Sequence, residues 1–227
     1  PLTPDQQKSL AAHKAMEFVQ DGQILGLGTG STVHHFLTVL GQQMQQGLRV
    51  RGVPTSQATA VYARQLGIPL LSNEEPWDID VAVDGADQVD PQLNLIKGGG
   101  GALLREKIVA KASRQFIVIV DKAKQVARLG LPFPLPVEIA QFGWKTTQRH
   151  LEKLGWPSPL RQIVGQPFLT DNGNYVMDLH IPEITDPSSL ESSLNQIPGV
   201  VECGLFVMMT SVVITGTNDG PLLTHAS

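Results

Sequence analysis

The chain has a single cysteine, no long apolar run and no excess of positive charge, and each of these shortages excludes a class of protein. Cys203 alone cannot form an internal disulfide or a multi-cysteine zinc site, and it suits a reducing compartment. No apolar stretch approaches the roughly 18–20 residues of a membrane span, and the N-terminal segment lacks the pattern of a secretory signal. We therefore expect a cytoplasmic protein, or a plastid one if a transit peptide has been removed.

The charge balance limits the partners of the protein. The net charge is −4 and the pI is near 5.8, so nothing in the totals attracts nucleic acid or a membrane surface. The six histidines, including His34 and His35, lack metal-ligand spacing with other donors, which predicts no metal site. An anionic ligand must consequently be held by a local group of residues.

The first part of the chain alternates between short apolar runs and segments with helical spacing. The runs at 23–28, 48–53, 68–71, 78–87 and 115–121 predict strands, and the segments at 10–19, 31–44, 57–67 and 103–113 predict helices. This alternation is typical of a Rossmann-like, doubly wound α/β fold with a mostly parallel sheet. In such a sheet, ligands bind beyond the carboxyl ends of the strands.

The character of the sequence changes after residue 130. A proline-punctuated segment is followed by predicted helices at 141–154 and 187–196 and by predicted strands at 160–164, 174–181 and 199–206. The order β-α-β-β-α-β indicates a smaller ferredoxin-like α+β domain, and a strand at 211–217 could return to the main sheet. We expect a catalytic domain of residues 1–130 plus 205–227 and a small domain of residues 131–204.

The turn "GLGTGST" follows the first predicted strand and offers glycines and hydroxyl groups to an anion. A dinucleotide site is one interpretation, but Ser31 occupies the third glycine position of its motif and no ribose-binding carboxylate follows the next strand. A terminal phosphate suits the turn better. A tight turn with a polar helix cap remains the simpler alternative.

Two carboxylates, Asp84 and Asp87, follow the buried run "VAV" with only Gly85 and Ala86 between them. Paired carboxylates at a strand end suit proton transfer, binding of sugar hydroxyls or a hard cation. A metal would require more oxygen ligands than this segment supplies. The structural alternative is an aspartate-rich turn that caps its own backbone amides.

The segment "KGGGGALLREK" places Lys97 and four glycines directly before a predicted helix that carries Glu106. Glycine permits close approach of the backbone to a ligand, and the helix dipole favours the ionised, proton-accepting form of Glu106. A mobile linker and a merely stabilising glutamate are the alternatives. Lys124, with Lys122 as its competitor, follows the fifth strand and can point over the same edge of the sheet.

The sequence resembles the type A ribose-5-phosphate isomerase family in several motifs. Four of them occur in this order: "GLGTGSTV", "VDGADQVD", "KGGGGALLREKIV" and "DKAKQV". Three more are "FPLPVE", "TDNGN" and "IPGVVECGLF". The resemblance covers nearly the whole chain. Members of that family commonly have three glycines and then a small residue after the lysine; here that residue is Gly101, which leaves Glu106 in register.

The resemblance implies interconversion of ribose 5-phosphate and ribulose 5-phosphate through an enediolate, in the non-oxidative pentose phosphate pathway, without metal or organic cofactor. It implies Glu106 as the base, with Asp84, Asp87 and Lys97 assisting ring opening and stabilising the intermediate. A homodimer, or a dimer of dimers, is implied as well. The implied substrate-binding residues are Thr29, Gly30, Ser31, Thr32, Asp84, Gly85, Ala86, Asp87, Lys97, Gly98, Gly99, Gly100, Lys124 and Lys8.

Two other functions remain open at this point. A sugar-phosphate-sensing module, like those of some bacterial transcription regulators, would share the turn and the sheet. We favour this function less than isomerisation, because such regulators work with a DNA-binding domain. Only a short segment precedes the first predicted strand here, and the net charge is negative. An NADP-dependent oxidoreductase would use Arg51 to bind the 2′-phosphate.

Overall fold

The computed structural model describes all 227 residues, which form two compact units. The first unit comprises Pro1–Ala86, Arg105–Gln125 and Met209–Ser227, and the second comprises Asp87–Leu104 and Val126–Met208. These boundaries differ from the expected ones, because residues 87–104, 126–130 and 205–208 belong to the second unit. There, β4 (Gln88–Val89) and β5 (Leu95–Ile96) form a small antiparallel sheet with β12 (Leu205–Phe206).

The first unit is built on a six-stranded sheet with the order β14-β13-β6-β3-β1-β2. All neighbouring strands are parallel except the β13–β14 hairpin, which confirms the predicted Rossmann-like α/β fold. The expected strand at 211–217 does return to this sheet, next to β6. The strands are β1 (Ile24–Leu27), β2 (Arg51–Pro54), β3 (Ile79–Asp84), β6 (Ser113–Asp121), β13 (Val212–Thr217) and β14 (Gly220–His225).

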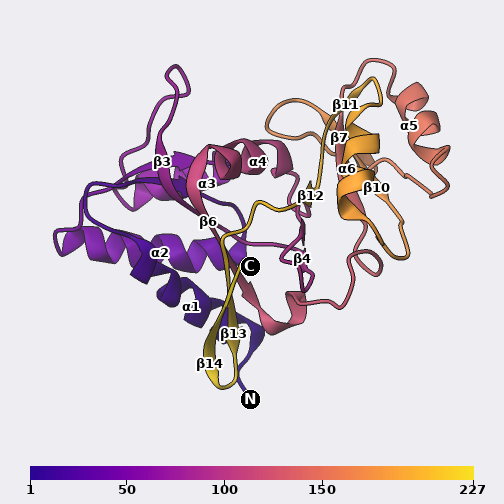
Figure 1. Cartoon of the computed structure of the whole chain (residues 1–227). Helices are drawn as coiled ribbons and strands as arrows, with labels where there is room; N and C mark the ends of the chain where they lie inside the picture. Colours follow the sequence, from indigo (N-terminus) through magenta and orange to yellow (C-terminus); the bar gives the residue numbers. More distant parts are fainter. The chain divides into compact units, whose positions relative to one another are not determined.

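Helices cover both faces of this sheet (Figure 1). On one face, α1 (Pro4–Ala15) and α2 (Ser31–Gln45) bury alanines and large apolar side chains such as Phe36 against the strands. α4 (Leu103–Ala112) approaches the other face, where Val109 lies close to Gly26 of β1. α3 (Gln57–Gln65) follows β2, and the 3₁₀ turns η1 (Met16–Phe18) and η2 (Lys122–Lys124) follow α1 and β6.

Three predictions for the first unit were incomplete or wrong. α1 begins at Pro4 rather than near residue 10, because Thr3 and Gln6 form a capping box at its N-terminus. Residues 68–71 form no strand: only Leu70 makes a bridge, to Gly52, and Pro69 has no amide hydrogen to donate. β14 was not predicted, and it completes the edge of the sheet.

The second unit contains an antiparallel sheet of order β10-β7-β11, with α5 and α6 packed on one face. Its elements are β7 (Leu135–Ile139), α5 (Trp144–Glu152), β10 (Tyr175–Leu179), α6 (Pro187–Asn195) and β11 (Val200–Cys203). Buried Val137, Met177 and Leu194 contribute to the core between sheet and helices.

This α+β arrangement differs from the expected one in its strands. The segment predicted as a strand at 160–164 makes one bridge, from Leu160 to Met177, and otherwise forms a separate ribbon of β8 (Gln162–Ile163) and β9 (Gln166–Pro167). The predicted strand at 199–206 is divided at Gly204 between β11 and β12, which belong to different sheets. A Cβ on Gly204 would lie 2.2 Å from the carbonyl oxygen of Lys97, so the chain passes too closely for a side chain there.

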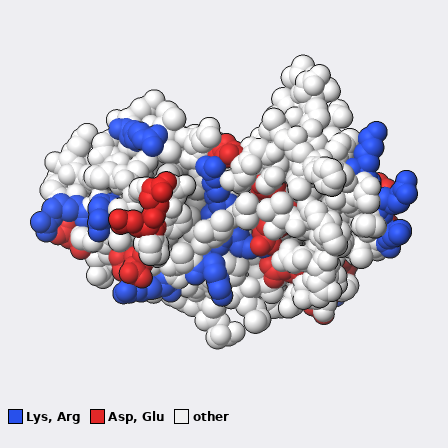
Figure 2. All heavy atoms as spheres, turned by 90° about the horizontal axis from the view of Figure 1, so that it is seen from above, with Lys and Arg blue, Asp and Glu red and all other residues white.

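No helix is both long and apolar enough to cross a membrane. On the face shown in Figure 2, acidic and basic side chains lie in small mixed groups rather than in one large area of a single sign. This distribution agrees with the small net charge of the sequence.

Candidate active site

Of the predicted site residues, those in the first unit lie at the carboxyl ends of β1, β3 and β6, on the neighbouring α1, and at the start of α4. They are Lys8, Thr29, Gly30, Ser31, Thr32, Asp84, Gly85, Ala86, Glu106 and Lys124. Asp87, Lys97, Gly98, Gly99 and Gly100 belong to the second unit. Because β1, β3 and β6 are adjacent and parallel, the structure brings three of the predicted polar clusters to one edge of the main sheet.

The turn after β1 is held by the carboxylate of Asp84. The backbone amides of Thr29 and Gly85 both donate to Asp84 Oδ1, at 3.1 and 2.7 Å. A Cβ on Gly28 would lie 2.3 Å from Asp84 Cγ, so only glycine allows the two strands to approach in this way. Asp84, which is 3% exposed, therefore fixes the shape of the turn in addition to any role toward a ligand.

A group of hydroxyl side chains stabilises the same turn through hydrogen bonds. Thr29 Oγ1 lies 2.8 Å from Thr55 Oγ1 and 2.9 Å from Ser56 Oγ, and Thr59 Oγ1 donates to the carbonyl of Gly28 at 2.7 Å. Thr55, Ser56 and Thr59 are not among the residues predicted from the sequence. The available signal was a second run of hydroxyl residues, "PTSQAT", directly after the second predicted strand.

Lys8 reaches the turn from α1. Its Nζ donates to Ser31 Oγ at 3.0 Å, where Ser31 is the first residue of α2. The first turn of α2 contains no acidic residue, so a cation, hydroxyls and a helix N-terminus occur together without a competing carboxylate in that turn. This combination favours binding of a phosphate group.

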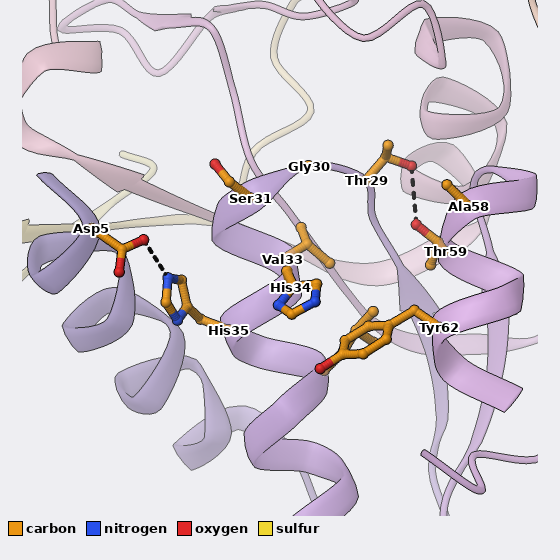
Figure 3. Close-up of a pocket in the computed structure, with 11 residues that line it drawn as sticks. Asp5, Thr29, Gly30, Ser31, Val33, His34, His35, Ala58, Thr59 and Tyr62 are labelled. Carbon is orange, nitrogen blue, oxygen red and sulfur yellow. Dashed lines mark hydrogen bonds and ion pairs between the residues drawn. The ribbon is translucent and has the colours of Figure 1, made fainter. Parts of the chain in front are cut away.

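A cavity of about 530 Å³ borders the turn, with Thr29, Gly30 and Ser31 in its lining (Figure 3). Inside it, the His34 ring stacks on Tyr62 with centroids 4.0 Å apart, and His35 Nε2 lies 2.8 Å from Asp5 Oδ1. The His35–Asp5 pair joins α2 to α1, the helix that carries Lys8. The two histidines thus have packing and pairing partners beside the predicted phosphate site.

Glu106 lies in the first turn of α4 and is 5% exposed. A carboxylate near a helix N-terminus is stabilised by the dipole, and a buried position restricts the access of water. Lys124 is half-buried in η2, whereas Lys122 is exposed and donates to Gln125 Oε1 at 2.9 Å. The competing lysine is therefore engaged within its own turn.

In the second unit, the glycine loop (Gly98–Gly101) has a defined backbone. The amide of Gly99 donates to Asp87 Oδ2 at 2.8 Å, and the amide of Gly101 donates to the carbonyl of Gly98 at 2.9 Å. Gly98 and Gly101 have φ values of 107° and 78°, which other residues rarely adopt. Lys97, 3% exposed, directly precedes the loop, and its Nζ lies 5.6 Å from the centre of the Phe206 ring.

Replacing Lys8 with methionine is expected to raise KM for a phosphorylated sugar roughly 10- to 100-fold with a smaller change in kcat, because one charge-assisted hydrogen bond is lost. Initial rates measured over a range of substrate concentrations separate the two constants. Lys14→Met is the matched control, since Lys14 lies on the same helix but pairs with Glu17. Equal KM values for the Lys8 and Lys14 variants would contradict a phosphate role for Lys8.

Known proteins resemble this chain over most of its length. Residues 51–220 match the family model described as ribose 5-phosphate isomerase A (phosphoriboisomerase A). A ribose-5-phosphate isomerase A from Gloeobacter violaceus is 51% identical over 214 residues, which cover 94% of this chain and 93% of the relative.

Solved structures give the same result. A D-ribose-5-phosphate isomerase in complex with phospho-erythronic acid superposes with a TM-score of 0.95 at 41% identity, covering 99% of this chain and all of the other. Ribose 5-phosphate isomerase from Plasmodium falciparum superposes with a TM-score of 0.94 at 38% identity, covering 97% and 98% of the two chains. Identity at this level over almost the full length is decisive, and the chain belongs to the ribose 5-phosphate isomerase A family.

Proposed function

We propose that this protein is an aldose–ketose isomerase that interconverts D-ribose 5-phosphate and D-ribulose 5-phosphate. The observation that carries the proposal is the pairing of a phosphate-type turn at the end of β1 with two buried carboxylates, Asp84 and Glu106, in a chain of this family. The phospho-erythronic acid bound by a related enzyme supports it, because that compound combines a phosphate with a planar carboxylate. A planar, negatively charged carboxylate resembles an enediolate.

In the proposed reaction, Glu106 removes the proton from C2 of the open-chain aldose. The electrons of the C–H bond form the C1–C2 double bond, and the carbonyl oxygen at C1 becomes the enediolate oxygen. Return of the proton from Glu106 to C1, with transfer of the C2 hydroxyl proton to the C1 oxygen, produces the ketose and restores the ionised base. A positioned base of this kind contributes about 100- to 10,000-fold to the rate.

The remaining groups are assigned supporting roles in the proposal. Asp84, Asp87 and Lys97 assist ring opening and stabilise the developing oxyanion, for which preorganised donors are effective. Thr29, Gly30, Ser31 and Thr32, together with Lys8, hold the phosphate. Gly85, Ala86 and the amides of Gly98, Gly99 and Gly100 border the sugar, and Lys124 makes a further substrate contact.

The proposal also includes the oligomeric state, the location and the pathway of the enzyme. We propose a homodimer, or a dimer of dimers, that acts in the cytoplasm in the non-oxidative branch of the pentose phosphate pathway. Two domains, one Rossmann-like and one smaller α+β domain, would form each subunit. Family membership supports these assignments.

The direct test is to incubate the purified protein with ribose 5-phosphate and to follow the sugar carbons by NMR. We expect conversion to an equilibrium mixture with ribulose 5-phosphate, and much slower conversion of unphosphorylated ribose, because the phosphate supplies binding energy that orients the reacting carbons. Binding of ribose 5-phosphate without conversion would contradict the proposal and favour a sensor. A fluorescence response to NADPH would instead favour the oxidoreductase alternative, which the relatives do not support.

A further inference from the structure

The guanidinium group of Arg161 lies between a carboxylate and the glycine loop of the second unit. Arg161 Nη1 donates to the carbonyl oxygens of Gly98 and Gly99, at 2.9 and 3.1 Å. On its other side, Nε and Nη2 donate to the two oxygens of Asp178, at 2.9 and 2.6 Å. One side chain therefore joins β10, which carries Asp178, to the backbone of the loop.

The ion pair between Arg161 and Asp178 is largely shielded from solvent. The Arg161 and Asp178 side chains are only 15% and 18% exposed, so solvent screens their attraction less than on an open surface. The Phe168 ring lies 5.5 Å from the Arg161 guanidinium carbon. The same ring packs against Gly101, where a Cβ would come within 2.3 Å of it. The loop is thus held at both ends.

The geometry of the peptide bond carries this restraint to the functional side of the loop. In a trans peptide the carbonyl of one residue and the amide of the next point in opposite directions. The Gly98 carbonyl is directed at Arg161, and the Gly99 amide of the same peptide donates to Asp87 at 2.8 Å. Likewise, the Gly99 carbonyl bound by Arg161 directs the Gly100 amide away from the guanidinium.

We propose that Arg161, oriented by Asp178, is a positioning residue of the isomerase: it sets the two peptides of the glycine loop and, through the Gly99 amide, the orientation of Asp87. The role in turnover rests on the proposed function, in which Asp87 and the loop amides act on the sugar. Two carbonyls and a carboxylate must be bound at once, which requires the several donors of a planar guanidinium group. Lysine cannot replace arginine here, because it has a single ammonium group.

The test compares Arg161→Lys and Asp178→Asn with Arg128→Lys as the matched control. Arg128 pairs with Glu183 in the same unit, but both side chains are about half exposed or more, and neither belongs to the proposed site. We expect Arg161→Lys to lower kcat/KM roughly 10- to 100-fold, mainly through kcat, because small displacements of catalytic groups have effects of this size. Asp178→Asn should have a smaller effect of the same kind, and Arg128→Lys should be within twofold of wild type.

Hydrogen exchange supplies a readout that does not depend on activity. Amide exchange in residues 97–103 should rise in Arg161→Lys while residues 175–179 of β10 remain protected. If Arg161→Lys does not fold, Arg161→Ala titrated with guanidinium at concentrations well below those that denature the protein replaces it. We expect partial recovery of kcat in that titration.

Unchanged turnover and unchanged loop exchange in Arg161→Lys would overturn the proposal. So would a uniform rise in exchange across the second unit, which is the signature of a merely structural ion pair. An inactive wild-type protein would overturn the proposed function instead, and loop exchange would still decide whether Arg161 holds the loop.

Discussion

Replacement of Glu106 by glutamine is expected to lower kcat for ribose 5-phosphate by a factor of about 100 to 10,000, because the neutral amide cannot accept the proton from carbon. Glutamine has nearly the same shape as glutamate, so binding of the sugar phosphate should be retained. Steady-state kinetics gives the loss of turnover, and calorimetric titration with phospho-erythronic acid gives the affinity. Glu106→Asp, which keeps the carboxylate but withdraws it by one methylene, should retain part of the rate.

The control for this substitution is Glu152→Gln, which removes an exposed carboxylate from the end of α5 and should leave kcat unchanged. Near wild-type turnover in Glu106→Gln would contradict the assignment of the base. A loss of binding in proportion to the loss of turnover would also contradict it, because it would indicate a structural role for Glu106.

Substitution of alanine for Gly28 is expected to reduce both stability and activity. The added Cβ would lie 2.3 Å from Asp84 Cγ and 2.7 Å from Asp84 Cα, which belongs to the backbone of the neighbouring strand β3. Relief of this overlap must displace the carboxylate that binds the amides of Thr29 and Gly85. We expect a decrease of about 1–3 kcal/mol in the free energy of unfolding, as for overpacked cores, and a loss on the order of 100-fold in kcat/KM.

Gly52→Ala separates these two effects. Gly52 lies on the adjacent strand β2, and a Cβ there would come within 2.4 Å of a Leu27 methyl group, a side-chain atom that can move. Urea unfolding should therefore show a loss of stability in both variants, whereas kinetics should show a large loss of activity only in Gly28→Ala. Similar kcat/KM values for the two folded variants would refute the role given to the Asp84-bound turn.

The core strands of the first unit could be predicted because β3 and β6 are apolar runs with polar residues at their ends. The failures have local causes. The run at 68–71 contains Pro69, which cannot donate to a ladder, so only a single bridge forms at Leu70. β14 is an edge strand in which no residue is fully buried, and its sequence therefore has no apolar alternation to detect.

The second unit was harder to predict because its boundaries depend on contacts between distant residues. β5 pairs with β12, more than a hundred residues later, and this pairing places residues 87–104 in the second unit. The predicted motifs of the site are local in sequence, which is why Asp84, Lys97 and Glu106 could be proposed as site residues from the sequence alone. Thr59 and Arg161 act on those motifs from other elements, and only the folded structure reveals their partners.

We expect this protein to isomerise ribose 5-phosphate by moving a proton through an enediolate. The most direct test is to incubate the wild-type protein with ribose 5-phosphate in deuterium oxide and to measure deuterium at C2 of the recovered aldose by NMR and mass spectrometry. We predict progressive incorporation of deuterium at C2 of the aldose. The proton that Glu106 removes exchanges with the solvent, and some enediolate molecules then revert to the aldose with deuterium at C2. Conversion to ribulose 5-phosphate with no deuterium after prolonged incubation would indicate a hydride shift and would contradict the account.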